Sequence, residues 1–341
     1  MHELLDTLTE WQAEGDVIAL ATVIKTWGSS PRKTGAKMAV TADGKIIGSV
    51  SGGCVEGAVI EAGTETLADK RPQLLEFGVA DETAWSVGLA CGGQIEVFVE
   101  PLAAGHLHLM REWLAQGTGG AVATVVRGAD ELLGRKLFIS GSGAVSGSIA
   151  PELDAAIAQV TLPQFAARQS QPVELADTAV TLFIDVILPP PMLIIVGGGH
   201  ISVTLARMAR LLDFRITVIE PRRAFGNKAR FPQVDRLIQA WPQKAFQQLP
   251  VTPNTAVVLL THDPKIDDPA LAAVLDASPF YIGALGSKHT QAKRQQRFLE
   301  KGFTAVSLAR IRGPIGLDIH AQTPEEIALA IMAEIIQAYR A

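Results

Sequence analysis

Residues 192–202 predict the fold class of this chain, and they read Met192-Leu193-Ile194-Ile195-Val196-Gly197-Gly198-Gly199-His200-Ile201-Ser202. Five consecutive apolar residues are typical of a strand buried in a parallel sheet. The glycines permit a tight turn into a helix, and they let a phosphate approach the helix N-terminus. Ser202 stands where the fingerprint usually has its third glycine, and serine is small enough for the helix to pack on the strand. The stretch therefore predicts a Rossmann-like dinucleotide-binding unit.

A second strand, at 215–219, ends at Glu220, close to the position where an acidic side chain binds a ribose hydroxyl. A carboxylate there would repel a 2′-phosphate, whereas Arg222 and Arg223 would attract one, so the choice between NAD and NADP stays open. We predict a doubly wound parallel α/β sheet in this region. Its candidate nucleotide-binding residues are Gly197, Gly199, His200, Glu220 and Arg222.

Two more loops follow predicted strands of the same sheet, and loops after strand ends line the ligand crevice of such folds. Their candidate residues are His262 and Asp263 in the first loop, and Gly286, Ser287 and Lys288 in the second. Ser287 would cap the following helix, and with Lys288 it would form an anion site. His262 and Asp263 either form an acid–base or metal pair or only satisfy the backbone of their turn.

The run Leu188-Pro189-Pro190-Pro191 separates this domain from the part before it, because consecutive prolines cannot continue a helix or a central strand. We predict domains at 1–188 and 189–341. The first domain alternates strands with helices, without a visible internal repeat, which predicts a mixed α+β fold. The predicted strands lie at 16–25, 36–48 (a hairpin turning at Asp43-Gly44), 94–99, 121–126, 135–140 and 178–187, and the helices near 55–69, 105–116 and 152–168.

The two cysteines of the chain, Cys54 and Cys91, each lie beside a pair of glycines. Cys54 ends Ser51-Gly52-Gly53-Cys54 just before the helix predicted at 55–69, whose dipole would favour a reactive thiolate. The alternative is that both cysteines are small buried residues in tight turns. Glycine lets a ligand approach a thiol closely, so we treat both as candidate ligands.

The composition narrows the classes of function. A formal net charge of −5 argues against a nucleic-acid-binding protein. No cationic segment precedes an apolar core at the N-terminus, and no apolar run reaches the roughly 18 residues of a membrane helix. Two cysteines without zinc-site spacing suit a reducing compartment. We expect a cytoplasmic protein that contacts neither nucleic acid nor membrane.

Taken in order, these segments resemble the xanthine dehydrogenase accessory factor family (XdhC/CoxI type). The matching runs are Gly28-Ser29-Ser30-Pro31-Arg32, Ser51 to Glu56, Cys91-Gly92-Gly93, 197–202, Glu220-Pro221-Arg222, His262 to Lys265, Gly283 to Lys288, Pro314 to Asp318 and Thr323 to Glu326. The resemblance covers both predicted domains and thins out over 102–188. The chain departs from the family at Ser202 and at His320, where glycine is more typical.

The resemblance implies a chaperone that binds molybdenum cofactor, protects it during sulfuration and delivers it to a xanthine dehydrogenase-type molybdoenzyme. Thiolates suit its soft metal–dithiolene end, so we expect Cys54 and Cys91 to act as metal ligands. Ser29, Ser30 and Arg32 would hold the pterin or its phosphate, with Gly52 and Gly53 giving access. The C-terminal domain would bind either the nucleotide of a dinucleotide form of the cofactor or a separate NAD(P). A cysteine desulfurase and a second copy of the chain are further expected partners.

Two other functions fit the same residues. One is an NAD(P)-dependent oxidoreductase with His262, Lys288 or His289 as acid or base. The other is a dinucleotide-sensing regulator. Both thiols lie outside the Rossmann-like half, and the sequence shows no compact catalytic triad, so the chaperone ranks first.

Overall fold

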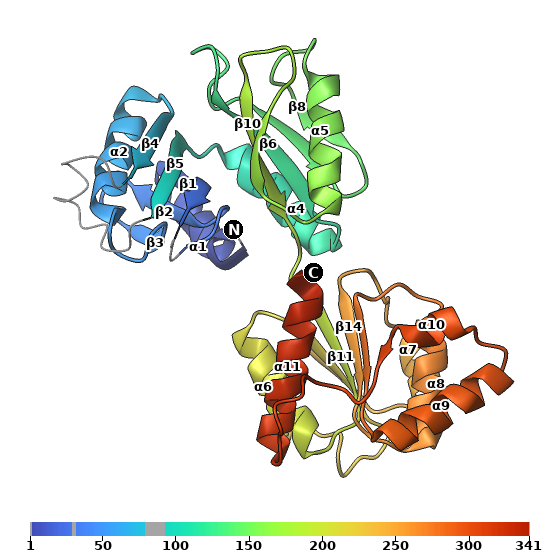
Figure 1. Ribbon diagram of the computed structural model, residues 1–341. Helices are drawn as coiled ribbons and strands as arrows, with labels where there is room; N and C mark the ends of the chain where they lie inside the picture. Colours follow the sequence, from blue (N-terminus) through green and yellow to red (C-terminus); the bar gives the residue numbers. More distant parts are fainter. Residues whose placement is uncertain (1, 29–31, 79–92, 341) are drawn as a thin grey trace. The chain divides into compact units, whose positions relative to one another are not determined.

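The computed structural model describes residues 2–28, 32–78 and 93–340 (Figure 1). The chain divides into two compact units, Met1–Pro189 and Pro190–Ala341. We call them the N-terminal and the C-terminal unit.

The N-terminal unit contains two antiparallel sheets of five strands. The first sheet and its helices comprise α1 (His2–Glu14), β1 (Ile18–Trp27), β2 (Lys37–Thr41), β3 (Ile46–Gly48), α2 (Glu56–Asp69), β4 (Gln73–Phe77) and β5 (Gln94–Pro101). The second comprises α4 (Ala104–Gln116), β6 (Gly120–Arg127), β7 (Lys136–Ser140), β8 (Val145–Gly147), α5 (Asp154–Ala166), β9 (Gln171–Glu174) and β10 (Thr181–Ile187).

The two sheets repeat one topology. The strand orders are β3-β2-β1-β5-β4 and β8-β7-β6-β10-β9, and in each sheet a helix lies between the third and fourth strands of the chain. We call residues 2–101 copy 1 and residues 104–187 copy 2. Equivalent residues are Thr22 and Thr124, Val23 and Val125, Gly35 and Gly134, Lys37 and Lys136, and Gly48 and Gly147. The expectation of no internal repeat is therefore wrong.

Two buried ion pairs join the copies reciprocally. Lys37 of copy 1 lies 2.8 Å from the Asp185 carboxylate of copy 2, and Lys136 of copy 2 lies 2.7 Å from the Glu100 carboxylate of copy 1. Each lysine also donates a hydrogen bond to a threonine of its own copy. Because buried charges are tolerated only when they are paired and hydrogen-bonded, the four charges fix how the two sheets pack.

The C-terminal unit contains a parallel sheet of six strands in the order β13-β12-β11-β14-β15-β16. Its elements are β11 (Met192–Val196), α6 (His200–Leu211), β12 (Arg215–Ile219), β13 (Arg236–Ile238), α7 (Pro242–Phe246), β14 (Thr255–Leu259), α8 (Pro264–Leu275), β15 (Tyr281–Ala284), α9 (Lys288–Glu300), α10 (Ala305–Ala309), β16 (Ile311–Arg312) and α11 (Pro324–Arg340). The chain crosses to opposite sides of β11, as in a doubly wound fold. The predicted fold class is confirmed, with a parallel Rossmann-like sheet following a mixed α+β part.

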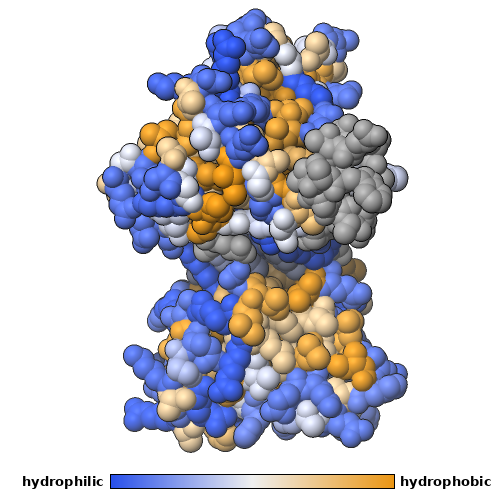
Figure 2. Space-filling model, turned by 90° about the vertical axis from the view of Figure 1, so that its left-hand side faces the viewer, coloured by the Kyte–Doolittle hydropathy of each residue, from blue (hydrophilic) through white to orange (hydrophobic). Residues whose placement is uncertain are grey.

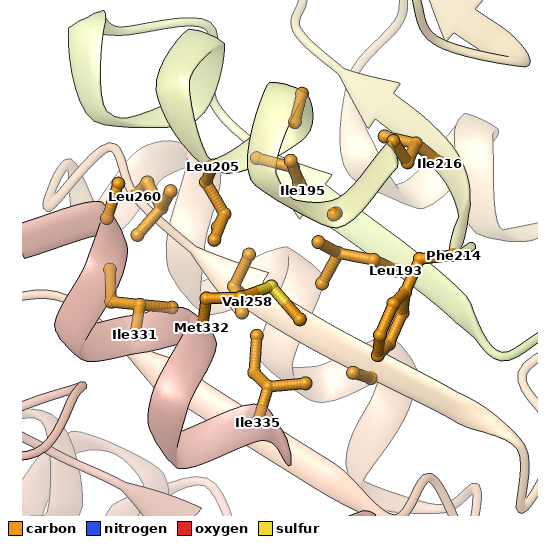
Figure 3. Close-up of a cluster of buried hydrophobic side chains, with 14 of the residues drawn as sticks. Leu193, Ile195, Leu205, Phe214, Ile216, Val258, Leu260, Ile331, Met332 and Ile335 are labelled. Carbon is orange, nitrogen blue, oxygen red and sulfur yellow. The ribbon is translucent and has the colours of Figure 1, made fainter. Parts of the chain in front are cut away.

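Helices cover both faces of this parallel sheet. The pair α6 and α11 lies on one face, and α7 to α10 lie on the other (Figure 1). Figure 3 shows the core under α6 and α11, where Leu205 and Met332 point toward strand residues such as Val258. Strands buried on both faces explain why 192–196 and 256–259 are apolar without alternation.

Apolar side chains also reach the surface of the C-terminal unit. Leu211 on α6 is 84% exposed and Leu329 on α11 is 53% exposed. Figure 2 shows apolar residues gathered on this unit, in the lower part of the view. Within the described part of the chain, every helix is too short or too polar to cross a bilayer.

Candidate functional site

Three connections of copy 1 start at one end of its sheet. Strands β1, β3 and β4 all run antiparallel to their neighbours β2 and β5, so their C-terminal ends point the same way. The connections that follow them are 28–36, 49–55 and 78–93. We call this edge the loop end of copy 1. Of the predicted ligands, Arg32, Gly52, Gly53 and Cys54 lie here, while Ser29, Ser30 and Cys91 fall outside the described residues.

Each of these connections is longer in copy 1 than in copy 2. The first is three residues longer between Val23 and Gly35 than between Val125 and Gly134. The second is one residue longer, and the third runs over 78–93 in copy 1 but only over 175–180 in copy 2. Each added stretch therefore belongs to a connection that starts at this end of the sheet.

A single carboxylate organises the loop that holds Cys54. One oxygen of Glu56 accepts hydrogen bonds from the amides of Val50, Ser51 and Gly52 (2.9–3.2 Å) and from the Ser49 hydroxyl. The other accepts from the Gly53 amide at 2.8 Å and from the Ser51 hydroxyl. Burial alone would raise the pKa of Glu56, but the hydrogen bonds from this loop lower it to about 2.

Cys54 is a free, half-buried thiol two residues before α2 begins. Its side chain packs against the apolar cluster between α2 and the sheet, which includes Val55 and Val59. The amides of Cys54 and Val55 donate to the Ser51 hydroxyl oxygen, at 3.0 Å each. A side chain at Gly53 would meet no atom within 4 Å. One side of the thiol loop is therefore packed and the other is open, while the amides of the loop donate to Ser51 and Glu56.

Arg32 links two of the three connections, because its Nε donates to the Ser49 carbonyl at 3.2 Å. The guanidinium is half-buried, at the start of the loop that leads to Cys54. The structure thus brings together Arg32 and the thiol loop, which the sequence had placed in one site.

A cavity of about 210 Å³ opens at the loop end of copy 1. Its lining includes Trp27, which is 67% exposed, together with Phe77 and Ile95. Phe77 and Ile95 belong to the apolar cluster that Cys54 also joins, so two of the residues that line the cavity pack in the same cluster as the thiol. Sequence reasoning missed Trp27, although an aromatic residue directly before Gly28 was an available signal.

In the C-terminal unit, the carboxylate that was predicted to bind a ribose hydroxyl forms hydrogen bonds within the protein. Glu220 is fully buried, and it accepts hydrogen bonds from the Gly198 amide at 2.7 Å and from both the amide and the guanidinium of Arg222. Burial opposes ionisation, but these donors hold the pKa of Glu220 below its usual range. Both oxygens of this carboxylate are engaged, so a ribose would have to displace Arg222.

The glycine turn before α6 is covered at one residue and open at the next. A side chain at Gly198 would lie 2.7 Å from the Phe225 carbonyl oxygen, whereas one at Gly199 would meet no atom within 4 Å. His200 is exposed, and α6 has no side-chain cap. Gly197, with φ of 111°, packs against Thr261 after β14. An anion would therefore have access to Gly199 and His200.

The remaining predicted residues lie on the same edge of the sheet. Asp263 is the N-cap of α8 and accepts from the Lys265 amide at 2.9 Å, while His262 is exposed with φ of 51°.

Ser287 is the N-cap of α9 and accepts from the Thr290 amide. The other predicted residues of that loop are Gly286, with φ of 135°, and the exposed Lys288. His320, the departure noted above, is exposed and lies 3.5 Å from Asp318.

A buried network behind this edge was not predicted. Asp267 is fully buried, accepts a hydrogen bond from the Thr261 hydroxyl and lies 3.4 Å from Arg294. Burial raises the pKa of this carboxyl. The network ties α8 and α9 to the loop after β14. Asp267 lies in the first turn of α8 and Arg294 within α9, and their spacing in the sequence gave no motif.

Among the described residues, no group of three or more histidine, cysteine, aspartate or glutamate side chains is arranged to hold a metal ion. The molecule is thus a two-unit α/β protein, with a free thiol in a glycine loop of the first unit and a Rossmann-like second unit.

Comparison with known proteins places this architecture in a family. Residues 193–335 match the XdhC Rossmann domain, and residues 11–78 match the XdhC and CoxI family. The chain is similar to a probable xanthine dehydrogenase subunit of Bacillus subtilis, with 32% identity over 98% of this chain and 96% of that protein. It is also similar to the molybdenum cofactor insertion chaperone PaoD of Escherichia coli, with 26% identity over 94% of this chain and 83% of the relative.

A solved structure has the same fold over nearly the whole length. The crystal structure of a xanthine dehydrogenase from Bacillus halodurans superposes with a TM-score of 0.77 and 27% identity, covering 99% of this chain and 95% of the other. The protein belongs to the XdhC and CoxI family, as the resemblance predicted.

Proposed function

We propose that this protein carries molybdenum cofactor at the loop end of copy 1 and delivers it, in sulfurated form, to a xanthine dehydrogenase-type molybdoenzyme. The observation that carries the proposal is the contrast between the two copies. Copy 1 alone is extended in three connections at one end of its sheet, and these hold both cysteines, Arg32 and the glycine pair before Cys54.

The chemistry of the cargo fits the described residues. Molybdenum cofactor supplies its own dithiolene ligands, so its carrier needs few metal ligands, and copy 1 offers the half-buried Cys54. A thiolate is a natural ligand for a soft, sulfur-bound metal. The Arg32 guanidinium, beside the thiol loop, suits the phosphate of the pterin, and the open side of Gly53 gives access. Cys91, Ser29 and Ser30 complete the proposed set from the other two connections.

A transfer experiment tests this function. Protein purified without oxygen from cells that make the cofactor is mixed with a cofactor-free xanthine dehydrogenase-type enzyme, and the activity gained is measured. The wild type should activate the enzyme, whereas Cys54→Ala should not. Ser148→Ala, at the equivalent loop of copy 2, is the control and should activate normally. Cyanide treatment before mixing, which removes terminal sulfur as thiocyanate, should abolish activation. Equal activation by Cys54→Ala would refute the role of the thiol.

The C-terminal unit is proposed to bind a nucleotide through Gly199 and His200. The support is the open helix N-terminus at these residues. The Arg222 guanidinium donates to both oxygens of Glu220, which gives no support to a ribose site of the usual kind. The NAD(P)-dependent oxidoreductase therefore remains a weaker candidate than the chaperone. Calorimetric titration of the whole protein with NAD, NADP, CTP and GTP decides whether any nucleotide binds, and His200→Asp should weaken the one that does.

Two partners are proposed with this function. A cysteine desulfurase would supply the terminal sulfur, and a second copy of the chain would complete a homodimer. Affinity capture of the wild type with the desulfurase, and light scattering of the purified protein, test each proposal separately.

A further inference from the structure

The internal repeat allows the thiol loop to be compared with a loop that has no thiol. Copy 1 reads Gly48-Ser49-Val50-Ser51-Gly52-Gly53-Cys54-Val55-Glu56, and copy 2 reads Gly147-Ser148-Ile149-Ala150-Pro151-Glu152-Leu153-Asp154. In both, a glycine of positive φ ends the third strand and an acidic side chain begins the helix. The two loops are therefore versions of one structure.

The acidic residues make the same contacts. In copy 2, Asp154 accepts hydrogen bonds from the Ser148 hydroxyl at 2.6 Å and from the amides of Ile149 and Ala150. In copy 1, Glu56 accepts from the equivalent Ser49 hydroxyl and from the amides of Val50 and Ser51. The carboxylate–loop contact is common to both copies, so it does not depend on the presence of a cysteine.

Copy 1 adds further contacts that reach toward the thiol. Its loop is one residue longer and its carboxylate one methylene longer, and Glu56 also binds the amides of Gly52 and Gly53. Gly53 directly precedes Cys54. The Ser51 hydroxyl extends the set, because it donates to Glu56 and accepts from the Cys54 amide. Glu56 therefore binds the amide of the residue before Cys54 directly, and it is linked to the Cys54 amide through the Ser51 hydroxyl.

We infer that Glu56 is the positioning residue of the thiol site: its carboxylate fixes the loop that presents Cys54, and Asp154 is its counterpart in a copy with nothing to present. The inference rests on the proposed function only where molybdenum content is measured. Glu56 acts through the loop backbone and does not itself touch the cargo. Removal of the Glu56 carboxylate should make the Cys54 thiol more accessible, although the cysteine itself is still present.

The test compares Glu56→Ala with the matched variant Asp154→Ala in the whole protein. The rate at which iodoacetamide labels Cys54 is measured by mass spectrometry of the Cys54 peptide, so that Cys91 does not contribute. Glu56→Ala should speed labelling by roughly tenfold or more, because several donors lose their acceptor and the loop opens more often. Asp154→Ala should leave the rate within about twofold, although it removes a similar contact.

Glu56→Gln separates the shape of the side chain from its charge. Glutamine keeps one acceptor oxygen but turns N–H groups toward donors of the loop. Its labelling rate should lie between those of the wild type and Glu56→Ala, which a role in overall folding alone would not produce. An unchanged rate in Glu56→Ala, or an equal change in Asp154→Ala, would overturn the inference.

Molybdenum content after anaerobic purification is the second readout. Glu56→Ala should lose molybdenum although it retains Cys54, and Asp154→Ala should keep it. Retention of molybdenum by Glu56→Ala would overturn the positioning role. If the wild type itself carries no molybdenum, the proposed function fails, while the labelling rates still decide whether Glu56 positions Cys54.

Discussion

The ammonium group of Lys37 in copy 1 lies 2.8 Å from the carboxylate of Asp185 in copy 2, with 3% and 13% of the two side chains exposed. Together with Lys136 and Glu100, this pair ties two copies of one fold into a single unit. Removing one partner leaves an uncompensated buried charge, which is costly. The two pairs therefore restrict how the copies can pack, alongside the apolar clusters that the copies share.

Lys37→Met should destabilise the N-terminal unit by about 3–5 kcal/mol. The double variant Lys37→Met/Asp185→Leu should recover most of this loss, because no charge is then left unpaired. Lys25→Met, which breaks a pair with Glu96 whose lysine is 60% exposed, is the control and should cost less than about 1 kcal/mol. Denaturant unfolding, followed by hydrogen exchange in peptides of β2 and β10, measures each change. Equal losses in all three variants would contradict a buried structural pair.

His106 on α4 should make the N-terminal unit sensitive to acid. Burial, with the nearby charge of Lys136, lowers its pKa to about 4, against an ordinary value near 6.5. Between these values the unfolded chain binds the proton and the folded chain does not, so stability falls as the pH drops from 6.5 toward 4.

His106→Phe should flatten this pH dependence, because phenylalanine carries no titrating proton and can pack on Phe138, whose ring centroid lies 4.8 Å from that of His106. Melting temperatures between pH 4 and 7 check the prediction. A slope as steep in the variant as in the wild type would assign the acid sensitivity to other groups.

Glu220→Gln should loosen the glycine turn of the C-terminal unit. The carboxylate binds the Gly198 amide and the Arg222 guanidinium, so its neutral replacement should cost about 1–3 kcal/mol. Because the pKa of Glu220 is lowered, its contribution is present above the ordinary glutamate pKa and is lost as the pH falls through the folded value.

Hydrogen exchange of the peptide that spans the glycine turn, at pH 7 and at pH 4, measures this effect. Exchange should be faster in the variant at pH 7, and the difference should shrink at pH 4. A difference that grows in acid would mean that Glu220 is not ionised in the folded protein.

Much of the fold could be predicted from local patterns. The apolar run at 192–196, its glycine turn and the acid at Glu220 predicted the parallel sheet, and the turn at Asp43-Gly44 predicted the hairpin of β2 and β3. These features depend on residues close together in the chain, where strand burial and turn geometry restrict the choice of residue.

The internal repeat could not be seen in the same way. Only a few positions share a residue type, such as Lys37 and Lys136, each followed eleven residues later by a glycine and a serine. The topology depends on the alternation of apolar and polar residues and on the pairing of strands, rather than on the identity of each residue. Two copies can therefore diverge in sequence and keep the same topology. The spacing from lysine to Gly-Ser was nevertheless a usable signal.

The candidate site was predicted in part. Glycines and a cysteine indicated the thiol loop, but the role of Glu56 depends on six hydrogen bonds that no motif specifies. The fingerprint predicted that Glu220 would face a ribose, whereas in the structure Glu220 forms a salt bridge with Arg222, two residues further along the chain. Local chemistry of this kind is decided by side-chain direction, which periodicity does not give.

Molybdenum per protein chain, measured by mass spectrometry after purification without oxygen, tests the central claim most directly. The account predicts a substantial fraction of one molybdenum per chain in the wild type and in Ser148→Ala, and almost none in Cys54→Ala. Equal molybdenum in Cys54→Ala and the wild type would contradict it.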